Sequence, residues 1–243
     1  MTRGSLVSAI ALSAALCQAA VQVRADGGHG VPVDGHPNWQ ERVLLVSTNE
    51  CRVAPSAFQQ RYFPDYPEIL QPPCYVSRPP LYWCAELGLS ARAHAEDMVL
   101  NDCFQYDSCD GTPWMDRIAS WYADTPVSEV IAHNFATPRD AVLAWLFEGG
   151  TSDGTCEFRA EIGHRYLLNQ SWWNEMGSGY FALGSDRKYV QDFGGGDADS
   201  DHPLVAGTHF FTGSGTVAFQ VNWFDATAPL VAELVLENQA HAM

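Results

Sequence analysis

Apolar residues recur at the spacing of an α-helix in several stretches of the chain. From Leu87 to Met98 they lie three or four positions apart, which places them on one face of a helix. Asn38 and Thr137 precede two further such stretches, and both are residue types that cap helix N-termini. We therefore predict four helices: Trp39–Cys51, Cys84–Leu100, Trp114–Tyr122 and Pro138–Phe147.

Strand patterns come later in the chain. Met176–Leu183 and Lys188–Gly194 are rich in Gly, Tyr, Phe and Val, and together they predict a β-hairpin with its turn at Gly184–Arg187. Three further strands are predicted at Thr208–Phe211, Thr216–Phe224 and Leu230–Leu236. Three strands are close to the minimum for a stable sheet, so we expect these C-terminal strands to pack against the main domain or against a partner chain.

Helices first and a hairpin late indicate an α+β fold with helices packed on an antiparallel sheet. Residues 54–80 contain seven prolines and are predicted to be a long loop rather than a helix. We divide the chain into a signal peptide (1–25), a flexible leader (26–37), a main domain (38–194), an acidic linker (195–207) and a β-strand extension (208–243).

The first 25 residues have the pattern of a secretory signal. Arg3 supplies a positive charge, and the apolar run Leu6–Leu16 is too short to span a bilayer. Cleavage is expected after Val23-Arg24-Ala25 or after Cys17-Gln18-Ala19. Lipid attachment at Cys17 is the alternative, although Leu16 is bulky where a small residue is needed. No later segment is long and apolar enough to be a transmembrane helix.

The charge and the cysteines narrow the classes of protein. A net charge of −16 argues against nucleic acid or an anionic membrane as partner, because no basic patch could neutralise phosphates.

Six cysteines remain after removal of the signal peptide: Cys51, Cys74, Cys84, Cys103, Cys109 and Cys156. An even number in an exported chain predicts disulfides, and Cys103 with Cys109 is the pair we expect. No Cys-x-x-Cys spacing occurs, which argues against a zinc thiolate site.

Short motifs between Trp39 and Gly194 resemble, in order and spacing, the bacterial branch of the CAP superfamily. This is the family of cysteine-rich secretory proteins, antigen 5 and plant pathogenesis-related proteins. The motifs are Asn49-x-x-Arg52, Pro80-Leu81, Ala91-Arg92-Ala93-His94-Ala95-Glu96-Asp97-Met98, Phe104-Gln105-Tyr106-Asp107-Ser108-Cys109-Asp110-Gly111-Thr112 with Arg117, Ser128-Glu129-Val130-Ile131-Ala132, Trp145, Gly163-His164-Arg165, Gly177-x-Gly179-Tyr180 and Tyr189-x-Gln191-x-Phe193-Gly194.

The resemblance implies a three-layer α-β-α sandwich with a cleft in which two histidines and two acids bind a divalent metal. His164 corresponds to the second histidine, Glu129 to the first acid and Glu148 to the second. Tyr106 stands in the place of the first histidine, and a neutral phenol is a poor metal ligand. We therefore expect no cofactor, and instead hydrogen bonds between Glu129, His164 and Tyr106. Zinc or another divalent cation, held weakly by Glu129, Glu148 and His164, is the alternative.

Other candidate residues each have a plainer interpretation. His133 follows Glu129 by four positions and would replace the missing ligand if that stretch were helical, but a surface histidine is the favoured interpretation. His94 is expected to pack at the boundary between layers. Asp197-x-Asp199-x-Asp201 resembles the start of a calcium loop, yet it lacks the later EF-hand positions and is better explained as linker. Trp172-Trp173 is expected to be half core and half surface.

No nucleophile motif is present, neither Gly-x-Ser-x-Gly nor His-Glu-x-x-His. We therefore predict a binding module without catalysis, whose partner is a small apolar ligand or a protein. One alternative is a metal-assisted hydrolase at Glu129, Glu148 and His164, with one of the acids as general base. A second alternative is an adhesive module in which the C-terminal strands add to the sheet edge of a partner.

Overall fold

The computed structural model describes residues 37–150, 156–160, 163–196, 204–211, 216–224, 230–236 and 239–242. The expected signal peptide and the possible calcium loop at Asp197–Asp201 lie outside these residues. Among the described residues, no helix has the length and hydrophobicity needed to cross a membrane.

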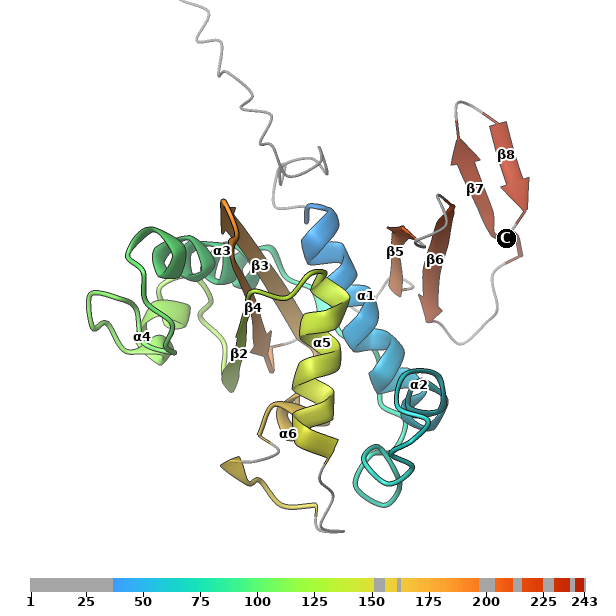
Figure 1. Ribbon diagram of the computed structural model, residues 1–243, viewed down its shortest axis with the longest axis horizontal. Helices are drawn as coiled ribbons and strands as arrows, with labels where there is room; N and C mark the ends of the chain where they lie inside the picture. The colour runs from blue at the N-terminus through green and yellow to red at the C-terminus, as the bar shows by residue number, and fades with distance from the viewer. Residues whose placement is uncertain are drawn as a thin grey trace, which may run out of the picture.

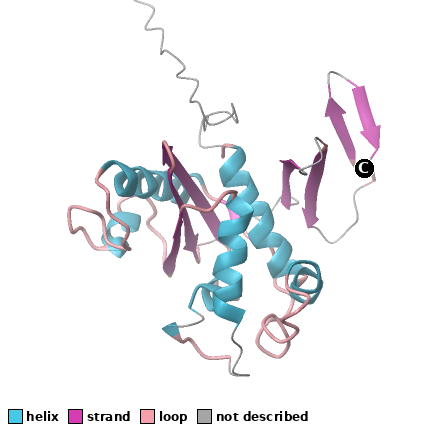
Figure 2. Cartoon of the chain, in the orientation of Figure 1, coloured by secondary structure: helices cyan, strands magenta, loops and turns pink. Residues whose placement is uncertain are grey.

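A four-stranded sheet forms the centre of the main domain (Figures 1 and 2). Its strands are β1 (Tyr82–Trp83), β2 (Val127–His133), β3 (Glu175–Leu183) and β4 (Asp186–Gly194), in the order β1-β3-β4-β2. β3 and β4 are antiparallel and joined by Gly184-Ser185, so the predicted hairpin is confirmed. β2 pairs antiparallel with β4, and β1 runs parallel to β3.

Helices cover both faces of this sheet. The helices are α1 (Trp39–Val53), α2 (Pro55–Tyr62), α3 (Ala85–Leu100), α4 (Trp114–Ala119), α5 (Pro138–Phe147) and α6 (Gly163–Leu168), with a short 3₁₀ turn at Glu148–Gly150. The four predicted helices are thus confirmed. Asn38 and Thr137 cap α1 and α5 as expected, each accepting a hydrogen bond from the backbone three residues later.

Alternating residues of β4 divide the core between the two faces. Tyr189 and Phe193 belong to the large cluster that also contains residues of α1 and α5. Val190 lies between them in sequence and packs against Ala91 and Met98 of α3 instead. The predicted three-layer α-β-α sandwich is therefore confirmed, with α3 on one face of the sheet and α1 and α5 on the other.

The outer layer approaches the sheet most closely where α3 crosses β3. A Cβ atom on Gly177 would overlap the backbone of Leu87 and Gly88, and one on Gly179 would overlap the backbone of Ala91. Glycine is required at both positions because the obstacle is helix backbone, which cannot move aside as a flexible side chain can.

The proline-rich stretch is not entirely loop, so that prediction was wrong in part. α2 begins directly at Pro55, in the first helical turn, where a proline costs nothing because its missing N–H would have no partner within the helix.

A disulfide joins Cys74 to Cys156, and the expected Cys103–Cys109 disulfide is also present. Cys51 and Cys84 are buried free thiols, so the six cysteines do not all pair.

The C-terminal strands form two hairpins, β5 (Leu204–Phe211) with β6 (Val217–Phe224) and β7 (Glu233–Leu236) with β8 (Gln239–Ala242). Two of these four strands differ from the prediction: β5 begins inside the expected linker, and β8 was not predicted. β5 leans on the main domain: Trp39 Nε1 donates to the His209 carbonyl oxygen at 2.7 Å. The Arg139 guanidinium carbon also lies 3.4 Å from the centre of the Phe210 ring.

Gly177→Ala tests the close contact between α3 and the sheet. We expect it to lower the free energy of unfolding by about 3 kcal/mol or more, because the new methyl group meets backbone on the helix side. Gly207→Ala is the matched control: its Cβ would lie 3.6 Å from the Gln220 carbonyl oxygen, an ordinary contact, and we expect a change within about 0.5 kcal/mol. Urea denaturation of both variants measures the difference, and equal effects would contradict the close contact.

Candidate functional site

Three of the four predicted cleft residues form one hydrogen-bonded chain. The hydroxyl of Tyr106 lies 3.0 Å from Nε2 of His164. On the other side of the imidazole ring, Nδ1 lies 2.8 Å from Oε1 of Glu148. A carboxylate can only accept, so Nδ1 carries the proton, and in the neutral ring Nε2 accepts from the phenol. The predicted hydrogen bond between Tyr106 and His164 is thus present.

Glu148 is held where α5 ends and α6 begins. Its backbone has the left-handed conformation, with φ 41°, which is uncommon for a residue with a Cβ atom. Its carboxylate accepts hydrogen bonds from the backbone N–H groups of His164 at 2.9 Å and Arg165 at 3.1 Å. Buried Arg165 completes the junction by donating to the carbonyl oxygens of Leu146 and Phe147, each at 2.6 Å. These bonds fix the histidine and the acid relative to each other.

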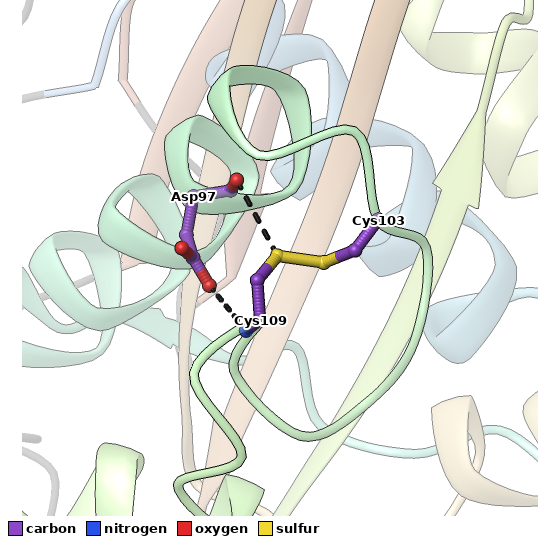
Figure 3. Close-up of side chains that lie close together, drawn as sticks. All are labelled: Asp97, Cys103 and Cys109. Carbon is purple, nitrogen blue, oxygen red and sulfur yellow. Dashed lines mark hydrogen bonds between the residues drawn. A yellow bond between two sulfur atoms is a disulfide. The ribbon is translucent and has the colours of Figure 1, made fainter.

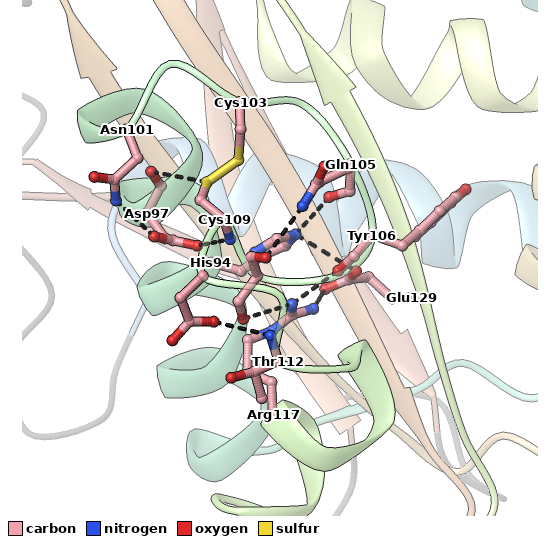
Figure 4. The surroundings of a disulfide bond; sticks show 12 residues. His94, Asp97, Asn101, Cys103, Gln105, Tyr106, Cys109, Thr112, Arg117 and Glu129 are labelled. Atoms are coloured by element: carbon pink, nitrogen blue, oxygen red, sulfur yellow. Dashed lines mark hydrogen bonds and ion pairs between the residues drawn. A yellow bond between two sulfur atoms is a disulfide. The ribbon is translucent and has the colours of Figure 1, made fainter.

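Glu129 lies apart from this chain of bonds, in an ion pair with Arg117 on α4 (Figure 4). Both side chains are almost fully buried. Arg117 also donates to the Tyr106 carbonyl oxygen at 2.8 Å, so one guanidinium holds both the acid and the loop that carries the phenol. The expected direct hydrogen bond to Glu129 from His164 or Tyr106 is replaced by this connection through Arg117.

A second buried acid faces Glu129. Asp192 lies opposite it in the β2–β4 register, and among the described residues neither of its carboxylate oxygens has a hydrogen-bond partner. Burial raises the pKa of Asp192 to about 6. Burial also raises the pKa of Glu129, and the nearby charge of Asp192 adds to the effect while Arg117 opposes it. A proton shared by the two acids would supply the missing hydrogen bond and relieve their repulsion.

Asp192 was not among the predicted site residues. The available signal was an acid inside Tyr189–Phe193, a stretch otherwise typical of a central strand. His94, expected at the layer boundary, is fully buried there, with Nε2 donating to the Gln105 carbonyl oxygen at 3.0 Å and lying 3.8 Å from Oε1 of Glu129. Burial and, after it, the charge of Arg117 lower the pKa of His94 to about 4, so the ring is neutral at pH 7.

The structure also tests the predictions made for His133 and for Trp172-Trp173. His133 ends a strand rather than following Glu129 on a helix, so the idea that it replaces the missing ligand is wrong. Its exposed ring packs at a tilt against Phe104, with the ring centroids 4.3 Å apart, as a surface histidine. Trp173 is buried and Trp172 is 43% exposed, which confirms the division between core and surface.

The side chains of the cleft do not fit a metal ion. Both ring nitrogens of His164 already make hydrogen bonds, and the carboxylate of Glu148 is bound to the start of α6. Glu129 has its cation in Arg117. In the part of the chain that the structure describes, the one set of three His, Cys, Asp or Glu residues with ligand atoms within 4.8 Å of one another lies elsewhere. The described residues of the cleft therefore offer a metal no convergent set of open donors.

Residues 76–193 match the CAP family model, which describes the cysteine-rich secretory protein family. No curated protein matches the chain. The solved structures similar to it include the following three. An extracellular protein containing a SCP domain from Bacillus anthracis is 20% identical, with a TM-score of 0.41, over 63% of this chain and 40% of that one. An outer surface protein of Borrelia burgdorferi is 20% identical, with a TM-score of 0.39, over 47% and 76%. The venom allergen-like protein 4 of Schistosoma mansoni is 19% identical, with a TM-score of 0.43, over 69% and 92%.

Asp192→Asn tests the buried pair of acids. The native pKa lies above that of the unfolded chain, so the folded protein keeps a proton that the unfolded chain releases as the pH rises from about 4 to 6. The buried Asp192 carboxyl group therefore lowers the free energy of unfolding as the pH rises through that window. The asparagine variant has no such group to ionise and does not lose this stability. We expect the variant to gain about 3 kcal/mol relative to the native protein between pH 4 and pH 8.

Denaturation in urea at a series of pH values measures this difference. The control is Asp65→Asn, in which an exposed aspartate loses the same charge without leaving a buried site. A stability difference between native protein and Asp192→Asn that does not change with pH would show that the pKa of Asp192 is not raised in the folded protein, and would contradict its burial as a charged group.

Proposed function

This chain belongs to the CAP superfamily, and we propose that it is an exported binding module whose cleft carries out no catalysis and holds no metal. The observation that carries the proposal is that the polar side chains of the cleft already bond to other groups of the chain. Tyr106 occupies one nitrogen of His164, Glu148 occupies the other, and Arg117 neutralises Glu129. Among the described side chains of the cleft, these contacts leave no donor open to bind a metal or to activate a water molecule through one.

The same contacts argue against the hydrolase alternative. A general base needs an accessible lone pair directed at the substrate or at a water molecule. Glu129 is buried against Arg117, and the lone pair of His164 faces the phenol of Tyr106. Burial raises the pKa of Tyr106, with the charges of Glu129 and Glu148 adding to it, so the phenol is also a poor nucleophile.

Export is supported by the two disulfides, because such bonds form and persist in oxidising compartments. The Cys74–Cys156 bond joins residues 82 positions apart, so it ties the proline-rich stretch to the segment that leads into α6. The predicted secretory signal at residues 1–25 is consistent with the same location.

An aromatic surface beside the cleft supports binding of an apolar ligand or a protein. We define it as Phe158, Tyr166 and Trp172. The Phe158 and Tyr166 rings lie 5.6 Å apart, and those of Tyr166 and Trp172 lie 6.3 Å apart. Phe158 is 58% exposed and Trp172 is 43% exposed, although rings of this size gain most by burial. Tyr166 lies two residues after His164 on α6, so this surface and the hydrogen-bonded chain share one helix.

Titration with Nile red, a neutral apolar dye, tests the binding surface. We expect saturable binding to the oxidised mature protein, weakened roughly fivefold to tenfold in Phe158→Ser and in Trp172→Ser because each loses about 1 kcal/mol of apolar contact. Leu100→Ser is the control, since Leu100 is equally exposed at 58% but lies at the end of α3. Equal weakening by all three variants, or no saturable binding by the native protein, would reject this surface as the site.

A further inference from the structure

Three residues of the types that bind metals, Asp97, Cys103 and Cys109, lie together at the base of the loop that carries Tyr106 (Figure 3). Asp97 of α3 approaches the Cys103–Cys109 disulfide, and one ligand atom from each of these three residues lies within 4.8 Å of the other two. Two thiolates and a carboxylate are a donor set that suits zinc. In the disulfide, however, the sulfur atoms bond to each other and carry no charge.

The carboxylate of Asp97 is fixed in place beside the sulfur atoms. Its Oδ2 accepts from the backbone N–H of Cys109 at 2.8 Å, and its Oδ1 accepts from Nδ2 of Asn101 at 2.8 Å. Sγ of Cys109 lies 3.5 Å from the Asp97 carbonyl oxygen. These outer hydrogen bonds orient the carboxylate as the partners of a metal ligand commonly do.

The electrostatics of this position favour a cation. Asp97 lies in the last turn of α3, where the unpaired carbonyl groups of a helix carry partial negative charge. The whole chain has a net charge of −16, which raises the local concentration of cations. Asp97 and both cysteines are only half-buried, so an ion and a reductant can reach them.

We propose that reduction of the Cys103–Cys109 disulfide creates a zinc site from the two cysteine sulfurs and the Asp97 carboxylate, with water as fourth ligand. A dithiol reductant breaks the S–S bond and is itself oxidised to a cyclic disulfide, and its two protons pass to the sulfurs of Cys103 and Cys109. Zinc then displaces both protons to solvent as the two Zn–S bonds form.

The loop can accommodate this change. Tetrahedral zinc with Zn–S bonds of about 2.3 Å places its two sulfur ligands about 3.8 Å apart. The Cα atoms of Cys103 and Cys109 are 6.0 Å apart, and side-chain rotation alone provides most of the required separation. The loop between them also carries Gln105 and Tyr106, whose carbonyl oxygens accept from His94 and Arg117. These two bonds hold the loop against α3 and α4 whether or not the sulfurs are joined.

Cobalt(II) titration tests this site, because a cobalt–thiolate bond gives a charge-transfer absorption in the near ultraviolet. The full mature protein is reduced with dithiothreitol, freed of reductant by gel filtration under argon, and titrated beside an oxidised sample. We expect the absorption in the reduced protein alone, with one cobalt ion per chain and displacement by zinc. A reduced protein that shows no such absorption overturns the proposal, whether it remains folded by circular dichroism or not.

Variants assign the absorption to these residues. Cys103→Ser combined with Cys109→Ser must abolish it, and absorption that persists would belong to other cysteines and overturn the site. Reduction also opens the Cys74–Cys156 disulfide, so its two thiols need a control. Cys74→Ser combined with Cys156→Ser removes them and must keep the absorption. Asp97→Asn should weaken cobalt binding roughly tenfold or more while leaving the Cys103–Cys109 disulfide able to form. Unchanged affinity in Asp97→Asn would remove the carboxylate from the site and overturn the three-donor assignment.

Discussion

The contact between α3 and the backbone of β3 sets the geometry on which the cleft depends. Gly177 and Gly179 place no Cβ atoms of β3 beneath α3 at these two positions, so the helix backbone lies directly against the strand there. The inner face of α3 consequently brings His94 within 3.8 Å of Glu129, an acid on the far edge of the same sheet. A helix held further away by side chains would leave room for water around these polar groups, and the buried charges would be solvated.

Because water is excluded, charge has to be balanced by the chain itself. Glu129 and Asp192 face each other in the interior with one guanidinium, that of Arg117, beside them. A buried carboxylate without a nearby cation is costly, and either a metal ion or an arginine can supply the positive charge. Arg117 does so here and simultaneously holds the Tyr106 loop. In the described part of the cleft, the buried charge of Glu129 is thus compensated by an arginine of the chain itself.

Much of the fold could be predicted from the sequence because its signals are local. The four helices follow from apolar spacing and from the caps Asn38 and Thr137, and the hairpin follows from composition. α2 was missed because prolines usually oppose helices, although Pro55 occupies the one turn where proline is tolerated.

The cleft was harder to predict because its contacts join distant segments. The resemblance identified Glu129, Glu148, His164 and Tyr106, but nothing local indicates that Arg117 faces Glu129 or that Asp192 is buried beside it. Those contacts depend on how α4 and β4 meet β2. Residue types therefore indicated which groups line the cleft, while their partners, protonation and accessibility depend on tertiary packing.

Calorimetric titration of zinc into the oxidised mature protein tests the central claim that the cleft's donors are already satisfied. The native protein should bind zinc no better than Tyr66→His, a control that adds a histidine at a similarly exposed tyrosine elsewhere. Tyr106→His should gain saturable binding, because it removes the phenol from Nε2 of His164 and adds an imidazole beside it. Micromolar binding by the native protein that is lost in Glu129→Ala would show that these side chains rearrange to hold a metal, and would contradict the account.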